Sequence, residues 1–167
     1  SSPDYSNAIK FYEKSCNLHD GVGCNNLANH YIEGLGTNVD KNKAVSLLKK
    51  GCEENYSISC YRLAVITMQG VLLKKNAQKA AQYMIKACDL GDSIGCHDLG
   101  YLYIDGNGVP RNPKKALELF TFSCEKGLAR GCGSLGSSYL LGGVVAVDFS
   151  KALELLQKAC SGDDAPS

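Results

Sequence analysis

Residues 88–96 read CDLGDSIGC, so two cysteines lie eight positions apart around a turn that contains glycine. The same corner recurs at Cys16/Cys24, Cys52/Cys60 and Cys124/Cys132. Each corner follows the previous one by 36 residues, and Cys160 falls where a fifth corner would begin. A fixed period of this length indicates a solenoid, in which one supersecondary unit is repeated and stacked. We therefore expect the function to lie on a surface created by stacking.

The composition is that of a folded, soluble chain: 167 residues, 44% hydrophobic, 21% charged and a net charge of +1. Because the basic residues form no stripe, we do not expect binding to nucleic acid. No apolar run approaches the roughly 18 to 20 residues that span a bilayer, so we expect no membrane span. Residues 1–6 lack the regions of a signal peptide, and we expect any export signal to have been removed.

The nine cysteines indicate disulfides rather than a metal site. No Cys-x-x-Cys pair is present, and the three histidines occur at unrelated positions of the repeat, so we expect no metal and no cofactor. Evenly spaced cysteine pairs are stable as disulfides in an oxidising compartment. The sequence therefore predicts a secreted or periplasmic protein.

One helix is predicted to end at each corner. Each of these helices begins with a short polar residue four positions before an alanine, which suits an N-cap. These capping residues are Asp4, Asp40, Asn76, Asn112 and Asp148.

A second helix is predicted to begin at the second cysteine of each corner. Its buried face has offsets 0, 3, 4 and 7 from that cysteine, which is helical spacing. The residues concerned are Cys24, Leu27, Ala28, Tyr31; Cys60, Leu63, Ala64, Thr67; Cys96, Leu99, Gly100, Tyr103; and Cys132, Leu135, Gly136, Tyr139. Glycine ends each helix, at Gly34, Gly70, Gly106 and Gly142. We expect an all-α chain of helical hairpins with almost no strand.

The order of these residues resembles the Sel1-like repeat, a relative of the tetratricopeptide repeat. The pattern runs Leu99-Gly100-x-x-Tyr103-x-x-Gly106-x-Gly108-Val109, Asn112-x-x-Lys115-Ala116 and Lys126-Gly127. The resemblance implies a right-handed αα-superhelix, with residues 1–167 as one solenoid domain. Its parts would be a partial repeat at 1–23 and repeats at 24–59, 60–95, 96–131 and 132–167. The second repeat departs from the pattern, with Thr67, Leu72 and Leu73 where Tyr and a Gly-x-Gly-Val turn are usual, so the shape of its loop is open.

The residues alone permit two disulfide pairings, because Cys24 and Cys52 also lie at the same end of one hairpin. We favour the eight-residue spacing, since the short corner brings consecutive helix ends together. The cysteine pairs also resemble the Helicobacter cysteine-rich protein family, whose disulfides staple the helices at each corner. That resemblance implies the bonds Cys16–Cys24, Cys52–Cys60, Cys88–Cys96 and Cys124–Cys132. The partner position of Cys160 follows Ser167, so we expect a free thiol there, in a monomer able to form a Cys160-linked dimer.

Two Ser-x-x-Lys sequences, at Ser46 and Ser123, are of the kind found in penicillin-recognising enzymes. Because Ser-Asp-Asn and Lys-Thr-Gly are absent from the sequence, we assign no catalytic residue. His30 and His97 are predicted to be structural. The cysteine-rich family nevertheless carries a β-lactamase and penicillin-binding label, so a weak activity of that kind remains the alternative function.

A binding surface is implied by the tetratricopeptide relatives, in which offsets 1, 5 and 8 line the concave side. The corresponding residues are Asn25, Asn29, Ile32; Tyr61, Val65, Met68; His97, Tyr101, Ile104; and Gly133, Ser137, Leu140, flanked by Asn26, Arg62 and Asp98. An apolar row beside amide and charged groups suits an extended peptide or a protein segment, host-directed or envelope-directed, with Tyr61 and Tyr101 as anchors. The alternative is that offset 8 packs between helices and the rest is solvated surface.

Overall fold

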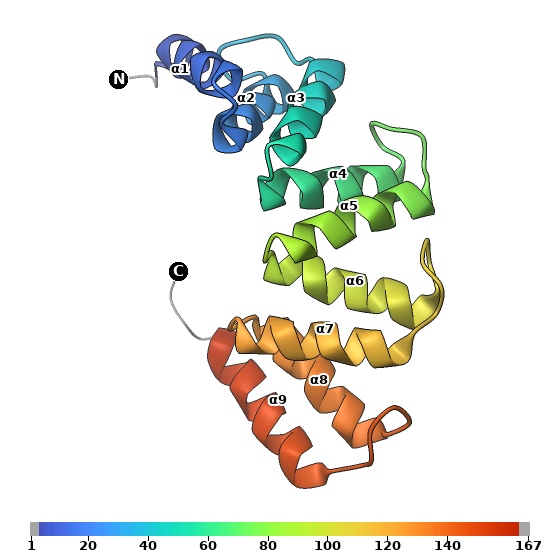
Figure 1. Cartoon of the computed structure of the whole chain (residues 1–167). Coiled ribbons are helices and arrows are strands. Elements are labelled where there is room, and N and C mark those ends of the chain that lie inside the picture. Colours follow the sequence, from blue (N-terminus) through green and yellow to red (C-terminus); the bar gives the residue numbers. More distant parts are fainter. Residues whose placement is uncertain (1–3, 164–167) are drawn as a thin grey trace. The chain divides into compact units, whose positions relative to one another are not determined.

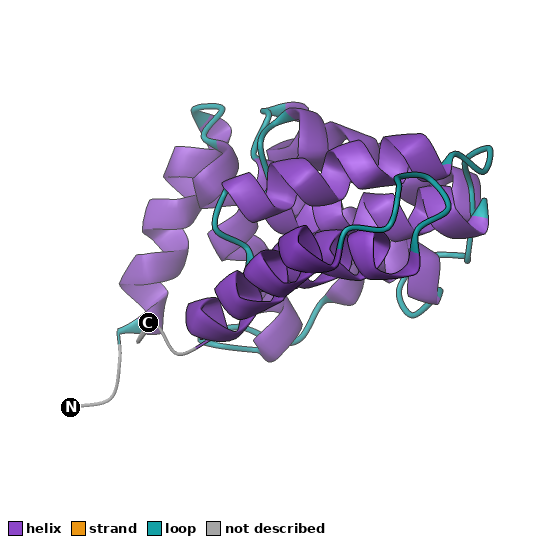
Figure 2. Cartoon of the chain, turned by 90° about the horizontal axis from the view of Figure 1, so that it is seen from below, coloured by secondary structure: helices purple, strands orange, loops and turns teal. Residues whose placement is uncertain are grey.

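The computed structural model describes residues 4–163, and all regular secondary structure in that range is helical (Figure 2). Its helices are α1 (Tyr5–Asn17), α2 (Gly21–Glu33), α3 (Lys41–Glu53), α4 (Ser57–Gln69), α5 (Ala77–Asp89), α6 (Ser93–Asp105), α7 (Pro113–Glu125), α8 (Ala129–Leu141) and α9 (Phe149–Asp163). We call α2, α4, α6 and α8 the A helices, and α1, α3, α5, α7 and α9 the B helices.

The chain divides into two compact units, Ser1–Leu90 with α1 to α5 and Gly91–Ser167 with α6 to α9. We call them the N-terminal unit and the C-terminal unit. Within each unit, every helix packs against the next one along the chain (Figure 1). The predicted all-α architecture of stacked helical hairpins is confirmed. The single solenoid domain and its repeat boundaries stay predictions.

The predicted helix ends are present. In the B helices, the side chain of each expected cap accepts a hydrogen bond from the backbone N–H three residues on, at 2.9 to 3.1 Å. The A helices end at glycines with positive φ, between 70° and 75°. Positive φ is a conformation that glycine adopts without steric cost, which explains why this position is glycine in every repeat.

The A helices begin earlier than predicted. For example, α2 begins at Gly21 rather than at Cys24, and α6 begins at Ser93 rather than at Cys96. In these two helices an aspartate caps the helix inside the corner: Asp20 accepts from the N–H of Val22, and Asp92 accepts from the N–H of Gly95. Helices α4 and α8 begin at the same distance before the cysteine without a side-chain cap. The cysteine therefore lies one turn inside the helix.

The predicted A-helix face forms the core, since all its members except Tyr139 are buried. The corners are closed by disulfides at the eight-residue spacing, namely Cys16–Cys24, Cys52–Cys60 and Cys124–Cys132. Cys88 and Cys96 are disulfide-bonded as well. In the Cys16–Cys24, Cys52–Cys60 and Cys124–Cys132 bonds the two Cα atoms lie only 4.4 to 4.7 Å apart, so consecutive helices cross in close contact.

Small residues beside the cysteines permit this close crossing. Gly131 precedes Cys132, and a Cβ atom added there would lie 2.6 Å from Cβ of Ser123, the residue before Cys124. At the Cys52–Cys60 corner the order is reversed, with Gly51 facing Ser59. Each of these crossings therefore has room for one side chain but not for two.

In α3, α7 and α9 a lysine packs on the tyrosine at offset 7 of the preceding A helix. The Nζ atoms of Lys43 and Lys151 lie 4.2 and 4.4 Å from the ring centres of Tyr31 and Tyr139. The hydrogen bond from Lys43 to the Tyr31 hydroxyl, 2.5 Å long, raises the pKa of that lysine. The second repeat differs because Thr67 stands where the tyrosine would be, and there Leu72 and Leu73 pack against the core instead.

Cys160 is exposed on α9 and is not disulfide-bonded. An exposed thiol is available for oxidation between chains, so we expect a covalent dimer at high protein concentration under oxidising conditions. Non-reducing gel electrophoresis and intact mass measure it. Cys160→Ser should abolish the dimer, and its persistence in that variant would show that another cysteine forms the link.

Candidate functional site

The predicted binding residues differ in how accessible they are. Asn25 and His97 are buried, whereas Tyr101, Ser137 and Leu140 are exposed. The others are half-buried: Asn26, Asn29, Ile32, Tyr61, Arg62, Val65, Met68, Asp98, Ile104 and Gly133. The most accessible members therefore lie in the C-terminal unit.

In the N-terminal unit, two polar residues of this surface, Asn25 and Arg62, bind each other. The guanidinium of Arg62 on α4 donates to the side-chain oxygen of Asn25 on α2, over 2.9 Å. Burial lowers the pKa of Arg62. Ile32 and Tyr61 pack against the core of this unit. The side chains of Asn25 and Arg62 therefore link α2 to α4.

In the C-terminal unit, a chain of hydrogen bonds links α6 to α8. The carboxylate of Asp98 lies 3.0 Å from Nδ1 of His97, and Nε2 of His97 lies 3.1 Å from the Ser134 hydroxyl. The Ser134 hydroxyl is also 3.0 Å from the Tyr101 hydroxyl. His97 and Ser134 occupy the same positions of the repeat as Asn25 and Arg62. The first residue of each pair is at offset 1 of one A helix, and the second is at offset 2 of the next A helix. His97 therefore has both a carboxylate and a serine hydroxyl as neighbours.

Sequence spacing could not show these contacts because Ser134 is 37 residues from His97. The order Asp–His–Ser resembles a nucleophile with its base, but Ser134 lies inside α8. Backbone N–H groups inside a helix are bonded within that helix and do not form an oxyanion hole. The network is better suited to fixing the orientation of Tyr101, whose ring packs 5.2 Å from the centres of both His97 and Phe120.

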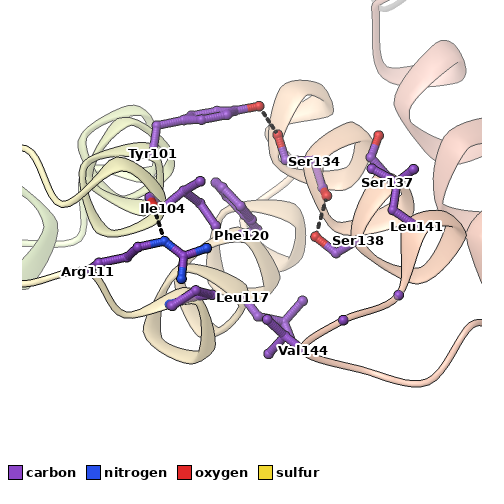
Figure 3. A pocket seen from close by; sticks show the side chains of 13 residues that line it. Tyr101, Ile104, Arg111, Leu117, Phe120, Ser134, Ser137, Ser138, Leu141 and Val144 are labelled. Carbon is purple, nitrogen blue, oxygen red and sulfur yellow. Dashed lines mark hydrogen bonds between the residues drawn. The ribbon is translucent and has the colours of Figure 1, made fainter.

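Beside Tyr101 lies a cavity of about 660 Å³ in the C-terminal unit (Figure 3). Of the predicted residues, Tyr101, Ile104 and Ser137 line it. We call it the α6–α8 pocket. Its volume is in the range of pockets that hold small ligands or a few peptide side chains.

Most of the pocket comes from residues that the offsets did not identify. Phe120 and Leu117 of α7 form its apolar floor, and Leu141 and Val144 come from the end of α8 and the turn after it. Leu141 therefore takes the place predicted for Leu140. These residues were missed because offsets within A helices carry no information about the B helix and the loops that complete the pocket.

Arg111 is the only charged residue among the described residues that line the pocket. Its Nε donates to the carbonyl of Ile104 over 3.0 Å, which fixes the guanidinium at the end of α6 (Figure 3). The remaining guanidinium nitrogens are donors, so this end of the pocket favours a carbonyl or carboxylate oxygen. The pocket thus combines apolar walls, a row of hydroxyls and one fixed cation.

The serines of the two Ser-x-x-Lys sequences are not placed for catalysis. The Ser123 hydroxyl is buried and donates to the carbonyls of Leu119 and Ser93, 2.8 and 3.0 Å away. Ser46 is exposed on α3. Within residues 4–163, no three His, Cys, Asp or Glu side chains are grouped to hold a metal ion, and no helix is long and apolar enough to cross a membrane.

Comparison with known proteins gives relatives of the same architecture. A Sel1 repeat protein from Oxalobacter formigenes superposes with a TM-score of 0.84 at 29% identity, over 93% of this chain and 64% of that one. Helicobacter pylori cysteine rich protein B superposes with a TM-score of 0.64 at 37% identity, over 79% of this chain and 95% of that one.

A curated relative, the putative β-lactamase HcpD of Helicobacter pylori, is 51% identical over 39 residues. That match covers 23% of this chain and spans 12% of the relative. The Sel1 repeat family model matches residues 1–20, 21–56, 57–92, 93–128 and 129–164, which is nearly the whole sequence. The resemblance inferred from the corners and helix patterns is confirmed, and the chain belongs to the Sel1 repeat family.

Proposed function

We propose that this chain is a protein-interaction scaffold of an oxidising, secreted or periplasmic compartment, and that the α6–α8 pocket docks an extended segment of a protein partner. The observation that carries the proposal is the combination of exposed apolar side chains with one fixed cation. Leu141 is 80% exposed and Tyr101 is 46% exposed, although both are large. Exposed apolar groups around a cavity mark a binding surface.

The pocket supports a division of roles. An apolar side chain of the segment packs against Leu117, Phe120 and Leu141, while a backbone carbonyl or a carboxylate accepts from Arg111. Tyr101 is the aromatic anchor, because its ring is already oriented by Phe120 and by the His97 network and loses little entropy on binding. Disulfide-bonded repeats support the oxidising compartment.

The proposal is tested with peptides selected from a random heptapeptide display library on the purified chain. We expect Leu141→Asp to weaken their binding at least about tenfold, because it places a charge on the apolar wall. Tyr101→Ala should weaken it by a similar factor. Fluorescence anisotropy measures both dissociation constants, and circular dichroism checks the fold.

A matched control is Leu153→Asp, because Leu153 is an exposed leucine of the same unit, on α9, and does not line the pocket. That variant should bind as the unchanged chain does. If Leu141→Asp binds normally while changes on B-helix surfaces abolish binding, the pocket assignment is wrong.

A β-lactamase-like activity is the second candidate function, and it rests on the name of the partial relative alone. The Ser123 hydroxyl gives it no support, because it is hydrogen-bonded to backbone carbonyls.

A further inference from the structure

A second pocket lies in the N-terminal unit, where α3, α4 and α5 meet, and has a volume of about 320 Å³. Four lysines line it together with Thr67, Leu73 and Asn76, and the lysines are Lys49, Lys74, Lys75 and Lys79. We call it the lysine pocket. No carboxylate is among its described lining residues, and within residues 4–163 none of the four lysines forms an ion pair.

The pocket arises from the departure in the second repeat. In the other full repeats the offset 7 residue is a tyrosine covered by a B-helix lysine, as in the pairs Tyr31/Lys43 and Tyr139/Lys151. Here Thr67 and Lys79 occupy the same two positions. Threonine lacks the aromatic ring of tyrosine. The space that the ring fills in the other repeats is therefore part of a pocket here, and Lys79 has no ring to pack on.

The Thr67 hydroxyl has no partner in the structure. Thr67 is only 1% exposed, and its Oγ1 forms no hydrogen bond although it is buried. A buried hydroxyl without a partner is destabilising and uncommon in folded proteins. Ser59 Oγ and Thr67 Oγ1 are both buried without a partner within the described residues, and of the two only Thr67 lines this pocket, so an acceptor bound there would supply the partner that Thr67 lacks.

The electrostatics favour an anion. Four lysines line one small pocket, and positive charges brought close together repel each other unless a negative charge lies between them. Asn76 caps the N-terminus of α5 at this pocket, and the positive end of a helix dipole adds to the same field. The lysines and the helix N-terminus are donors or positive charges, and the hydroxyl of Thr67 is able to donate as well. The Asn76 side-chain oxygen is already used, since it accepts from the N–H of Lys79.

We propose that the lysine pocket binds a phosphate group, either free or as a monoester. A dianion with several acceptor oxygens matches several ammonium donors and one hydroxyl better than a single carboxylate does. The volume exceeds that of the phosphate alone, which leaves room for the start of an attached group. This site lies in the N-terminal unit and does not depend on the function proposed for the α6–α8 pocket.

Titration of the intact chain with inorganic phosphate and with phenyl phosphate tests the proposal. Calorimetry measures affinity at constant ionic strength, with sodium chloride as the counter-titrant. We expect saturable binding of phosphate that chloride does not reproduce, together with a rise in melting temperature. Tighter binding of phenyl phosphate would identify a monoester as the natural form, and equal binding would identify the free ion.

Variants distinguish specific binding of phosphate in the pocket from nonspecific attraction of an anion to lysines. Thr67→Tyr restores the residue of the other repeats and fills the pocket, so phosphate affinity should fall at least about tenfold while the fold is kept. Thr67→Val, which keeps the shape and removes the hydroxyl, and Lys79→Gln should each weaken binding as well. Lys151→Gln is the matched control, since Lys151 has the same repeat position but covers Tyr139. Unchanged phosphate binding in Thr67→Val and Lys79→Gln, or equal loss in Lys151→Gln, would overturn the proposal.

Discussion

Opening the Cys52–Cys60 disulfide is expected to lower the free energy of unfolding by about 2.5 kcal/mol, the value that the chain-entropy model gives for so short a loop. The bond limits the conformations of the unfolded chain, so its loss stabilises the unfolded state rather than removing native contacts. If the other corners contribute equally, four corners amount to about 10 kcal/mol, which is comparable to the whole stability of an ordinary domain. Full reduction should therefore unfold the chain or leave it marginally stable.

The measurement compares urea unfolding of the Cys52→Ala/Cys60→Ala chain with that of the unchanged chain, followed by far-UV circular dichroism. Because both cysteines are buried, the lost sulfur contacts add to the effect. Unfolding of the unchanged chain with and without a phosphine reductant keeps all side chains and isolates the bonds. Cys160→Ala, at an exposed free thiol, should leave stability unchanged. An unaltered unfolding midpoint after reduction would contradict the entropic account.

Most of the fold could be predicted from the sequence because the repeat applies the same physical constraint several times. A single Asp40 or Gly106 would be a weak signal, but a cap and a positive-φ glycine at constant spacing define the ends of both helices. The A-helix starts were misplaced because the cysteine is the more visible residue. Asp20 and Asp92, which cap these helices, lie inside the corner and have no polar equivalent at Tyr56 and Leu128.

The sites were less predictable, because they arise where one repeat departs from the others. Arg111 occupies a position that holds Val39, Lys75 and Val147 in the other repeats, so the periodic pattern does not mark it as part of a pocket. Thr67 was recognised as a departure, yet its consequence was expected in the loop rather than in a pocket. Contacts such as that of His97 with Ser134 join adjacent repeats, and a helix offset does not contain this information.

In the first and third repeats the offset 4 residue of the A helix differs together with the B-helix residue that it faces. It is alanine at Ala28 and glycine at Gly100, whereas the matching B-helix residue is Leu48 in the first case and Phe120 in the second. A Cβ atom added at Gly100 would lie 2.5 Å from Cε1 of Phe120 and within 3.0 Å of two further ring atoms. The ring is held by His97 and Tyr101, so it cannot move away easily. The glycine is therefore required by the aromatic ring rather than by the helix.

We accordingly expect Gly100→Ala to lower the free energy of unfolding by about 2 kcal/mol, because overpacking outweighs the better helix propensity of alanine. Gly133→Ala is the matched control in the same unit: its new Cβ would meet only Ala159, at 3.9 Å, so this change should raise stability by about 0.5 to 1 kcal/mol. Phe120→Leu alone should be destabilising through lost volume. Combined with Gly100→Ala it recreates the Ala28/Leu48 pair, and the double variant should be at least about 1 kcal/mol more stable than the sum of the single effects predicts. Chemical denaturation of the unchanged chain, the two single variants and the double variant gives the four free energies of this double-mutant cycle. Strict additivity of the two changes would show that the Gly100–Phe120 contact does not determine the choice of residue at this position.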